Sequence, residues 1–258
     1  MIEMKSIKEK LFPEYLLRVQ DVSERFHGLK DAEISTETFS FYTSVSSVFS
    51  SKIEGEDIEL DSFIKHKGFG VEFQPDYTKK IDDLYEAYQF AKNNDLNKDN
   101  ILAAHRILSR NILQPHLQGV YRKNKMYVIT DHGQVEYVAA SPFEVQYEME
   151  KFHSELTVLK REKMEPELVF FYAALVHLVF VKIHPMNDGN GRLVRLLEKW
   201  FISEKLGEKA WFLQSEKMYY QHHQAYYNNI RKLGWEFETL DYEKALDFLL
   251  MLPQSLKI

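Results

Sequence analysis

Apolar residues recur at spacings of three and four along most of this chain, with polar residues between them. This spacing places the apolar side chains on one face of an α-helix. It predicts helices over residues 5–32, 36–54, 79–94, 98–112, 143–163, 166–183, 190–206, 215–233 and 242–252. Pro166 stands at a predicted first helical turn, and Gly55 and Gly207 stand where helices are expected to end. The pattern therefore predicts a mainly α-helical fold.

One segment departs from the helical pattern. In "MYVITDHGQVEYVA", β-forming residues flank Asp131-His132-Gly133-Gln134, which predicts a hairpin near residues 127–138. No repeat or Pro/Ser-rich linker divides the chain, and a soft boundary is predicted near residue 75, after "GFGVEFQPD". We therefore predict an N-terminal helical region over residues 1–75, and a core with C-terminal helices over residues 76–258.

The most apolar run is "LVFFYAALVHLVFVKI", from Leu168 to Ile183. It is shorter than the ~18–20 apolar residues of a spanning helix and contains His177 and Lys182. It therefore predicts the central helix of a soluble core. The N-terminal stretch "MIEMKSIKEKLFPEYLLR" has no apolar signal core, so we expect a cytoplasmic location.

Composition excludes several classes of function. The net charge of −6, with lysines and arginines scattered among acids, argues against a general binder of nucleic acid or anionic membranes. The absence of cysteine excludes disulfides, thiolate zinc sites and a cysteine nucleophile. No Walker-type phosphate loop is present, and "GFG" at 68–70 is too short for a dinucleotide fingerprint.

The apolar run ends abruptly in "HPMNDGNGRLVR", the segment His184–Arg195, which we call the anion loop. Gly189 and Gly191 let the backbone approach a ligand closely. The start of the following helix presents unpaired N–H groups and a positive dipole end. Arg192 and Arg195, three residues apart, share one face of that first turn, where two cations suit phosphate oxygens. These features together predict an anion site.

Asp188 is out of place beside a bare phosphate, because its carboxylate repels one. A Mg²⁺ ion held by one carboxylate and by substrate phosphates removes the conflict. The anion loop therefore predicts a site for a Mg-nucleotide or a similar polyphosphate, with His184 at its edge as a candidate base. The ordinary alternative is a tight connection between two helices, which does not require the charged residues.

A second stretch, "SSKIEG", ends at Gly55. Ser50 and Glu54 lie one helical turn apart and share a face. If Gly55 ends the helix, Glu54 lies at its negative pole, which is unfavourable by a few tenths to ~1 kcal/mol unless a cation compensates. Solvent or a neighbouring lysine would suffice, and the arginines of the anion loop are a second candidate.

At these two stretches the chain resembles the Fic family. The anion loop is similar to the family motif HPFx[D/E]GNGRxxR, with Met186 in place of Phe. "SSKIEG" is similar to the inhibitory motif [S/T]xxxE[G/N], and "GVYRKNKMYVI" followed by "EYVAASP" is similar to the segment entering the family's flap. The resemblance covers about Phe41 to Tyr227. It implies a helical-bundle core with a β-hairpin flap, transfer of AMP from Mg-ATP to a protein hydroxyl, and an N-terminal inhibitory helix acting in cis.

The resemblance also implies roles for the matching residues. His184 is the base that takes the proton from a Tyr, Thr or Ser hydroxyl of the target. Asp188 holds Mg²⁺ on the α- and β-phosphates. Gly189 and Gly191 offer backbone donors to phosphate oxygens, while Asn190 binds the α-phosphate. Met186 is expected to point into the core.

The two arginines complete this set of implied roles. Arg192 binds the leaving phosphates, and Arg195 contacts the γ-phosphate in the active state and Glu54 in the inhibited state. Tyr227 and Asn228 line an adenine pocket in similar proteins, as does Tyr226, although aromatic packing is an equal interpretation. A target is expected to dock along the hairpin edge. The chain itself is a further expected target, and the sequence leaves homo-oligomerisation open.

Three other functions remain open. An enzyme of the same fold could transfer UMP or a terminal phosphate, the same site could remove AMP with Glu54 orienting water, or the chain could bind nucleotide as a regulator without turnover. His177, one heptad before His184, suggests a two-histidine metal site, but a satisfied core histidine is favoured. Surface or packing roles are expected for His105, His116, His222 and His223.

Overall fold

The computed structural model describes residues 3–36, 40–71, 73–129 and 135–257. Its α-helices are α1 (Met4–Arg18), α2 (Val22–Gly28), α3 (Phe41–Ile53), α4 (Leu60–Phe69), α5 (Pro75–Lys92), α6 (Lys98–Leu108), α7 (Val145–Arg161), α8 (Pro166–Ile183), α9 (Asn190–Leu206), α10 (Ser215–Gln221), α11 (His223–Arg231) and α12 (Leu246–Leu249). Its strands are β1 (Tyr127–Ile129) and β2 (Val135–Val138), and its 3-10 helices are η1 (Pro115–Leu117), η2 (Glu208–Phe212), η3 (Phe237–Thr239), η4 (Tyr242–Ala245) and η5 (Leu252–Lys257). The predicted mainly α-helical fold with one small hairpin is confirmed.

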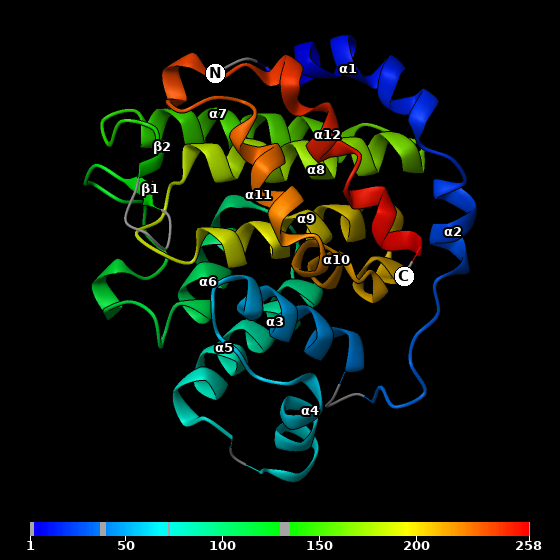
Figure 1. Cartoon of the computed structure of the whole chain (residues 1–258), viewed down its shortest axis with the longest axis vertical. Coiled ribbons are helices and arrows are strands. Elements are labelled where there is room, and N and C mark those ends of the chain that lie inside the picture. The colour runs from blue at the N-terminus through cyan, green and yellow to red at the C-terminus, as the bar shows by residue number, and fades with distance from the viewer. Residues whose placement is uncertain (1–2, 37–39, 72, 130–134, 258) are drawn as a thin grey trace.

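The most apolar segment of the chain forms the central helix, α8 (Figure 1). It begins at Pro166, which suits the first helical turn because proline lacks the N–H that has no helical partner there. Helices α1, α2, α7, α9 and α12 pack against it. By length and hydropathy alone α8 would qualify as a membrane span, but 83% of it is buried inside the protein. Because each buried aliphatic or Phe side chain contributes about 1.5–3 kcal/mol, α8 is the main anchor of the core.

Helix α9 joins the central helix to the N-terminal helices. It packs against α8 and also against α3, α5 and α6. The neighbouring helix α3 buries many short polar side chains: Ser44, Ser46, Ser47, Ser50 and Ser51. Their hydroxyls can bond within the helix, as Ser47 Oγ does by donating to Thr43 O at 2.8 Å. Short side chains let α3 approach its neighbours closely while leaving hydroxyls available for contacts with them.

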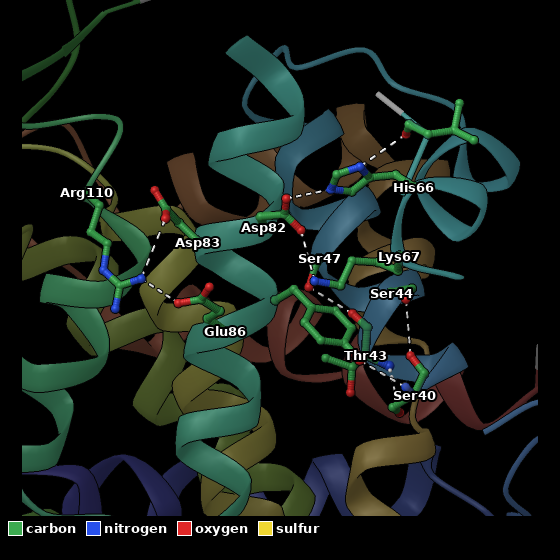
Figure 2. A network of polar contacts seen from close by, with 12 residues as sticks. Ser40, Thr43, Ser44, Ser47, His66, Lys67, Asp82, Asp83, Glu86 and Arg110 are labelled. Carbon is green, nitrogen blue, oxygen red and sulfur yellow. Dashed lines mark hydrogen bonds and ion pairs between the residues drawn. The ribbon is translucent and has the colours of Figure 1, made fainter. Parts of the chain in front are cut away.

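Polar contacts fasten α4 and the segment that follows α6 to α5, and Figure 2 shows His66, Lys67 and Arg110 making such contacts. His66 and Lys67, on α4, lie 2.7 and 3.1 Å from the two carboxylate oxygens of Asp82 on α5. Asp83 accepts hydrogen bonds from both the backbone and the side-chain nitrogen of Asn111, at 3.0 and 2.7 Å. Helix α5 is therefore held on two sides, which fixes the residues along it.

Strands β1 and β2 form an antiparallel hairpin in which Tyr127 pairs with Val138. The other edge of β2 is covered, because Val138 N–H donates to Trp235 O at 2.8 Å. The buried Tyr137 hydroxyl donates to Lys182 O at 2.8 Å, which ties the hairpin to the end of α8. The predicted hairpin is confirmed, while its predicted turn at residues 131–134 lies outside the described residues.

Several predicted helix boundaries are wrong. The helix predicted over 5–32 divides into α1 and α2 at Asp21, whose φ of 56° is left-handed. The helix predicted over 215–233 divides at His222, and the one predicted over 242–252 contains only the short α12 between 3-10 turns. Helix α4 is not predicted, because its only fully buried side chain is Phe63 and one buried residue leaves no periodic signal. The boundary predicted near residue 75, where α5 begins, stays a prediction.

Candidate active site

The candidate base, His184, lies at the end of α8 in an unusual backbone conformation. Its φ of 52° and ψ of 59° are left-handed, which is strained for a residue with a side chain. Its backbone N–H donates to Phe180 O at 2.9 Å. On the ring, Nδ1 lies 3.2 Å from Val181 O, so this nitrogen carries the hydrogen and Nε2 is the proton acceptor. When the imidazole is neutral, Nε2 is thus the ring nitrogen able to accept a proton.

Arg122 holds this strained backbone in place. Its Nε donates to His184 O at 2.7 Å, and its backbone N–H donates to Pro185 O at 2.9 Å. The same guanidinium donates to Asn124 O at 2.7 Å and to Ala140 O at 2.5 Å, on the two sides of the hairpin. Arg122 is only 2% exposed. It therefore joins the candidate base and both ends of the hairpin into one unit.

Hydrogen bonds inside the anion loop fix its shape. The Asn190 side chain donates to Met186 O at 3.0 Å and accepts from Met186 N–H at 2.8 Å. Met186 itself is fully buried, as predicted. The structure thus uses the Asn190 amide to close the loop, and its predicted contact with the α-phosphate stays a prediction.

A buried histidine supports the loop from below. Nε2 of His105 donates to Asp188 O at 2.9 Å, and its Nδ1 accepts from Gly119 N–H at 2.8 Å. Gly189 has a φ of +75°, and a Cβ there would lie 3.0 Å from Leu108 and 3.4 Å from His105. Glycine is therefore needed at 189 for both its backbone angle and its close packing. His105 is a packing residue, as expected, but its role in holding the loop was not apparent from the sequence.

The two arginines of the loop meet carboxylates from the segment Ser50–Glu56, which we call the carboxylate segment. Arg195 NH2 lies 2.7 Å from Glu54 Oε1, and Arg192 NH2 lies 2.6 Å from Glu56 Oε1. Two further hydrogen bonds join Arg195 to Ser50. Arg195 Nε donates to the Ser50 hydroxyl at 2.8 Å, and Arg195 Nη2 donates to the Ser50 carbonyl at 3.0 Å. The pairing of Glu54 with Arg195 that the resemblance implies is present, whereas the pairing of Glu56 with Arg192 was not predicted.

The approach of Glu54 depends on Gly191. A Cβ at Gly191 would collide with Oε1 of Glu54 and would lie 3.1 Å from Arg195 NH1. Gly55, with a φ of +87°, follows the end of α3 as predicted. The nearest lysine, Lys52, does not pair with Glu54 but lies 3.0 Å from Glu59. Glu54 is therefore compensated by the arginine of the anion loop.

Charge and burial set the protonation of these groups. Burial alone would raise the pKa of Glu54, but the charges of Arg195 and Arg192 hold that pKa below its usual value. Burial lowers the pKa of His184 to about 4. The charge of Arg122 adds to this lowering of the His184 pKa, while Glu54 and Asp188 oppose it. At neutral pH the site therefore holds an ionised Glu54 beside a neutral His184.

A third cation on α9 extends this contact between helices. The fully buried Lys199 Nζ donates to Ser46 Oγ on α3 at 2.6 Å, and it lies 2.8 Å from Glu216 Oε2 on α10. Ser46 and Ser50 are one turn apart on α3, as are Arg195 and Lys199 on α9. This matched spacing is the signal in the sequence that would have revealed the interface between the two helices.

The remaining candidates have the following positions. His177 is a satisfied core histidine, because its two ring nitrogens lie 2.8 Å from Glu198 Oε2 and 2.9 Å from the Tyr226 hydroxyl. Tyr226 is thus a packing residue. Tyr227 packs partly against the core and Asn228 is exposed, so their adenine contact stays a prediction. Three further candidate histidines, His116, His222 and His223, are at the surface as expected.

The residues present fit a magnesium ion only together with phosphates. Asp188 is exposed, and its Oδ1 accepts from Gly189 N–H at 2.6 Å. Among the described residues, no three His, Cys, Asp or Glu side chains gather in a way that could hold a metal. Because Mg²⁺ is commonly bound by one or two carboxylates with substrate phosphates and water, a single carboxylate at this position is sufficient.

Comparison with known proteins agrees with this geometry. Residues 95–202 match the model of the Fic/DOC family, a region that includes the anion loop but not the carboxylate segment. A curated relative, Protein adenylyltransferase Fic of Nematostella vectensis, is 33% identical over 106 residues. That alignment covers 41% of this chain and 22% of the relative, so the chain matches about a fifth of that protein's length.

Solved structures extend the likeness to nearly the whole chain. A Fic family protein from Desulfovibrio desulfuricans G20 superposes with a TM-score of 0.71 at 18% identity, covering 98% of this chain and 73% of that one. A Fic domain containing signaling protein from Bacteroides thetaiotaomicron VPI-5482 gives 0.65 at 18% identity, covering 98% and 94%. Fic-1 from C. elegans gives 0.66 at 17% identity, covering 98% and 72%. At these identities the likeness establishes the Fic-like helical fold, while the match to the Fic/DOC family is limited to residues 95–202, which include the anion loop.

Proposed function

We propose that this protein is a protein adenylyltransferase, which transfers AMP from ATP to a Tyr, Thr or Ser hydroxyl of a target protein. The observation that carries the proposal is the pair of buried arginines in the first two turns of α9, beside a neutral histidine. Both arginines meet a carboxylate from another part of the chain, so the site attracts anionic oxygens. The relative named as a protein adenylyltransferase supports the same activity.

The residues of the site suit each part of the transfer. His184 Nε2 takes the proton from the target hydroxyl, whose oxygen forms a bond to the α-phosphorus of ATP. The bond from that phosphorus to the oxygen bridging to the β-phosphate breaks, and pyrophosphate leaves. Arg192 and Arg195 stabilise the charge that builds on the leaving phosphates. A Mg²⁺ ion on Asp188 and the phosphates would supply further neutralisation of that charge.

The carboxylate segment supports inhibition in cis. Glu54 Oε1 occupies a position next to Arg195 where a phosphate oxygen would otherwise bind. ATP that enters while Glu54 is in place is displaced from the geometry needed for attack, and a shift of about 1 Å costs on the order of a hundredfold in rate. The protein is therefore inhibited until Glu54 moves, which gives the carboxylate segment a regulatory role.

The hairpin is the proposed docking edge for a target. Among the described residues, β2 pairs with β1 on one edge and contacts the chain at Trp235 on the other, which leaves the outer edge of β1 for an extended target segment. Proline at Val128 or Ile129 is expected to weaken target labelling through lost ladder bonds of the hairpin, while ATP affinity is unchanged. Self-modification and a cytoplasmic location belong to the same proposal.

The test compares two labelled forms of ATP. Purified protein carrying Glu54→Gly is incubated with Mg²⁺ and with ATP labelled at either the α- or the γ-phosphate. The expected result is incorporation of the α-label into protein without the γ-label. Incorporation of the γ-label would indicate phosphate transfer, and ATP binding without either label would indicate a regulatory module. Loss of AMP from a pre-labelled target on incubation with the unmodified protein, which keeps Glu54, together with no incorporation by the Glu54→Gly protein, would indicate hydrolytic removal of AMP.

A further inference from the structure

The carboxylate of Glu56 lies in a position that the inhibitory pairing of Glu54 does not explain. Glu56 follows α3 by three residues, and its backbone N–H donates to Ser51 O at 3.1 Å. Its side chain is 5% exposed, although carboxylates are seldom buried unless they are paired. The partner is Arg192, at 2.6 Å and also 5% exposed. A buried charge pair of this kind is costly to desolvate, so its presence calls for a reason other than stability.

A second cation approaches the same oxygen atom. Lys80 Nζ, on α5, lies 3.3 Å from Glu56 Oε1, the atom that Arg192 contacts. Lys80 lies on α5, two residues before Asp82. Because Asp82 contacts His66 on α4, this part of α5 is held in a fixed position (Figure 2). The Oε1 atom of Glu56 therefore marks a point where one anionic oxygen receives two positive charges from two different helices.

The pairing leaves part of the guanidinium unused. Among the described residues, neither Arg192 Nε nor Glu56 Oε2 has a hydrogen-bond partner, although both atoms are buried. A guanidinium presents several donors in a fixed fork, and a phosphate offers more acceptor oxygens than a carboxylate held at one atom. The contact with Glu56 therefore satisfies Arg192 only in part, which favours exchange for a ligand with more oxygens.

We propose that Arg192 and Lys80 form a subsite for the terminal phosphates of a nucleotide, and that Glu56 occupies this subsite when the carboxylate segment is docked. The carboxylate oxygen stands in for a phosphate oxygen. This inference rests on the proposed function in taking the anion to be part of ATP, and it adds a binding residue from α5, outside the anion loop. It also means that the carboxylate segment covers both arginines of the site, with Glu54 on Arg195 and Glu56 on Arg192.

The experiment measures nucleotide binding rather than transfer. Calorimetric titrations with ATP and with AMP, each with Mg²⁺, are made on protein carrying Glu54→Gly, so that Glu54 does not compete. Adding Glu56→Gln is expected to tighten ATP binding by about three- to tenfold, because a competing charge is lost while side-chain size is kept. Adding Lys80→Gln to that variant is expected to remove most of the gain. AMP, which lacks terminal phosphates, should bind equally to all three proteins.

Two matched controls separate this subsite from general electrostatics. Glu59→Gln removes an exposed carboxylate three residues after Glu56, and Lys79→Gln removes an exposed lysine adjacent to Lys80. Neither should change ATP affinity by more than about twofold, because exposed charges are screened by solvent. Thermal unfolding of each variant, measured without nucleotide, confirms that it is folded before its affinity is compared.

The possible outcomes are distinct. Weaker ATP binding in Glu56→Gln would mean that Glu56 positions Arg192, and this would overturn the proposal. Equal changes in the affinities for ATP and AMP would also overturn it, because the subsite would then not recognise the terminal phosphates. An unchanged ATP affinity on loss of Lys80 would remove Lys80 from the site. If these affinities change as expected but no α-label is ever transferred, the subsite stands and the proposed transferase activity fails.

Discussion

The anion loop and the carboxylate segment face each other across the site, but they are held in different ways. The anion loop is fixed by hydrogen bonds to its own backbone, from Arg122 to His184, from His105 to Asp188 and between the Asn190 amide and Met186. The carboxylate segment directs Glu54 and Glu56 at the cations of the site itself. In the proposed function, the loop therefore keeps its shape when a nucleotide enters, whereas the two carboxylates compete with that nucleotide.

The largest expected effect comes from a change in the anion loop. His184→Ala in Glu54→Gly protein is expected to lower incorporation of α-labelled AMP by about 10²–10⁴-fold, because the proton acceptor is lost. ATP affinity should change little, since the imidazole is not needed to hold phosphate. Initial labelling rates and calorimetric affinities give the two values, and His222→Ala, at an exposed position, is the matched control. Transfer near the parent rate would remove His184 as the base.

The next largest effect is expected from a change in the carboxylate segment. Glu54→Gly is expected to raise auto-modification on the order of a hundredfold, because the phosphates regain the geometry that Glu54 prevents. Arg195→Ala should not reproduce the gain, because it frees Glu54 but deletes a phosphate ligand. The double variant should stay slow, as expected of groups that share one interaction.

Initial rates with α-labelled ATP across these proteins test the inhibitory role of Glu54. Asp57→Gly, at a side chain that is 82% exposed, controls for added backbone freedom in the same turn. If Glu54→Gly stays as slow as the unmodified protein while its labelling remains measurable, then the contact of Glu54 with Arg195 is structural only.

A smaller effect is expected where the loop is held. Arg122→Lys keeps a positive charge but cannot make the bonds that join His184, Asn124 and Ala140. Because His184 would lose its fixed position, transfer in Glu54→Gly protein is expected to fall about tenfold, while ATP affinity is retained. Labelling rates and affinities are compared with Lys123→Ala, an exposed neighbour. A proportional loss of ATP affinity would show that Arg122 acts on the anion site rather than on the base.

The smallest expected effect is on the pH dependence of the labelling rate, which should not change near pH 6.5, where a histidine usually titrates. The pKa of His184 is lowered from 6.5 to about 4, mainly by burial, so the imidazole stays neutral as pH falls toward about 5. The rate of labelling by Glu54→Gly protein should therefore stay nearly constant between about pH 8 and 5.5. The variant keeps His184 neutral over this range, because the charge of Glu54 raises the His184 pKa and its loss lowers that pKa further. A rate that halves near pH 6.5 would contradict the assignment.

The same group contributes to the pH dependence of stability. Between about pH 6.5 and 4 the unfolded chain binds a proton at this histidine and the folded protein does not. The contribution to the free energy of unfolding is therefore present above pH 6.5 and is lost as pH falls through this range. Denaturant unfolding of the parent and of His184→Ala, compared at several pH values, measures this contribution.

The sequence alone determined those features that depend on local pattern. The apolar run from Leu168 to Ile183 is long and continuous, which predicted a buried central helix, and the structure contains that helix. The glycines, arginines and aspartate of the anion loop are close in sequence, so their shared position at the start of α9 follows from helix geometry. The likeness of "SSKIEG" to a known motif predicted the pairing of Glu54 with Arg195.

Only the tertiary structure decided which distant groups complete the site. Glu56, Lys80 and His105 belong to common residue types in stretches with no distinguishing motif, and Arg122 lies in the stretch similar to the flap segment but had no predicted role. Each contacts an atom far away in the chain. Glu56 and Arg192, for example, are 136 residues apart. Such contacts arise because packing of α3, α5 and α6 against α9 buries their polar groups together, and a buried polar group must find a partner wherever the fold supplies one. Periodicity records which face of a helix is buried, but it does not record what that face meets.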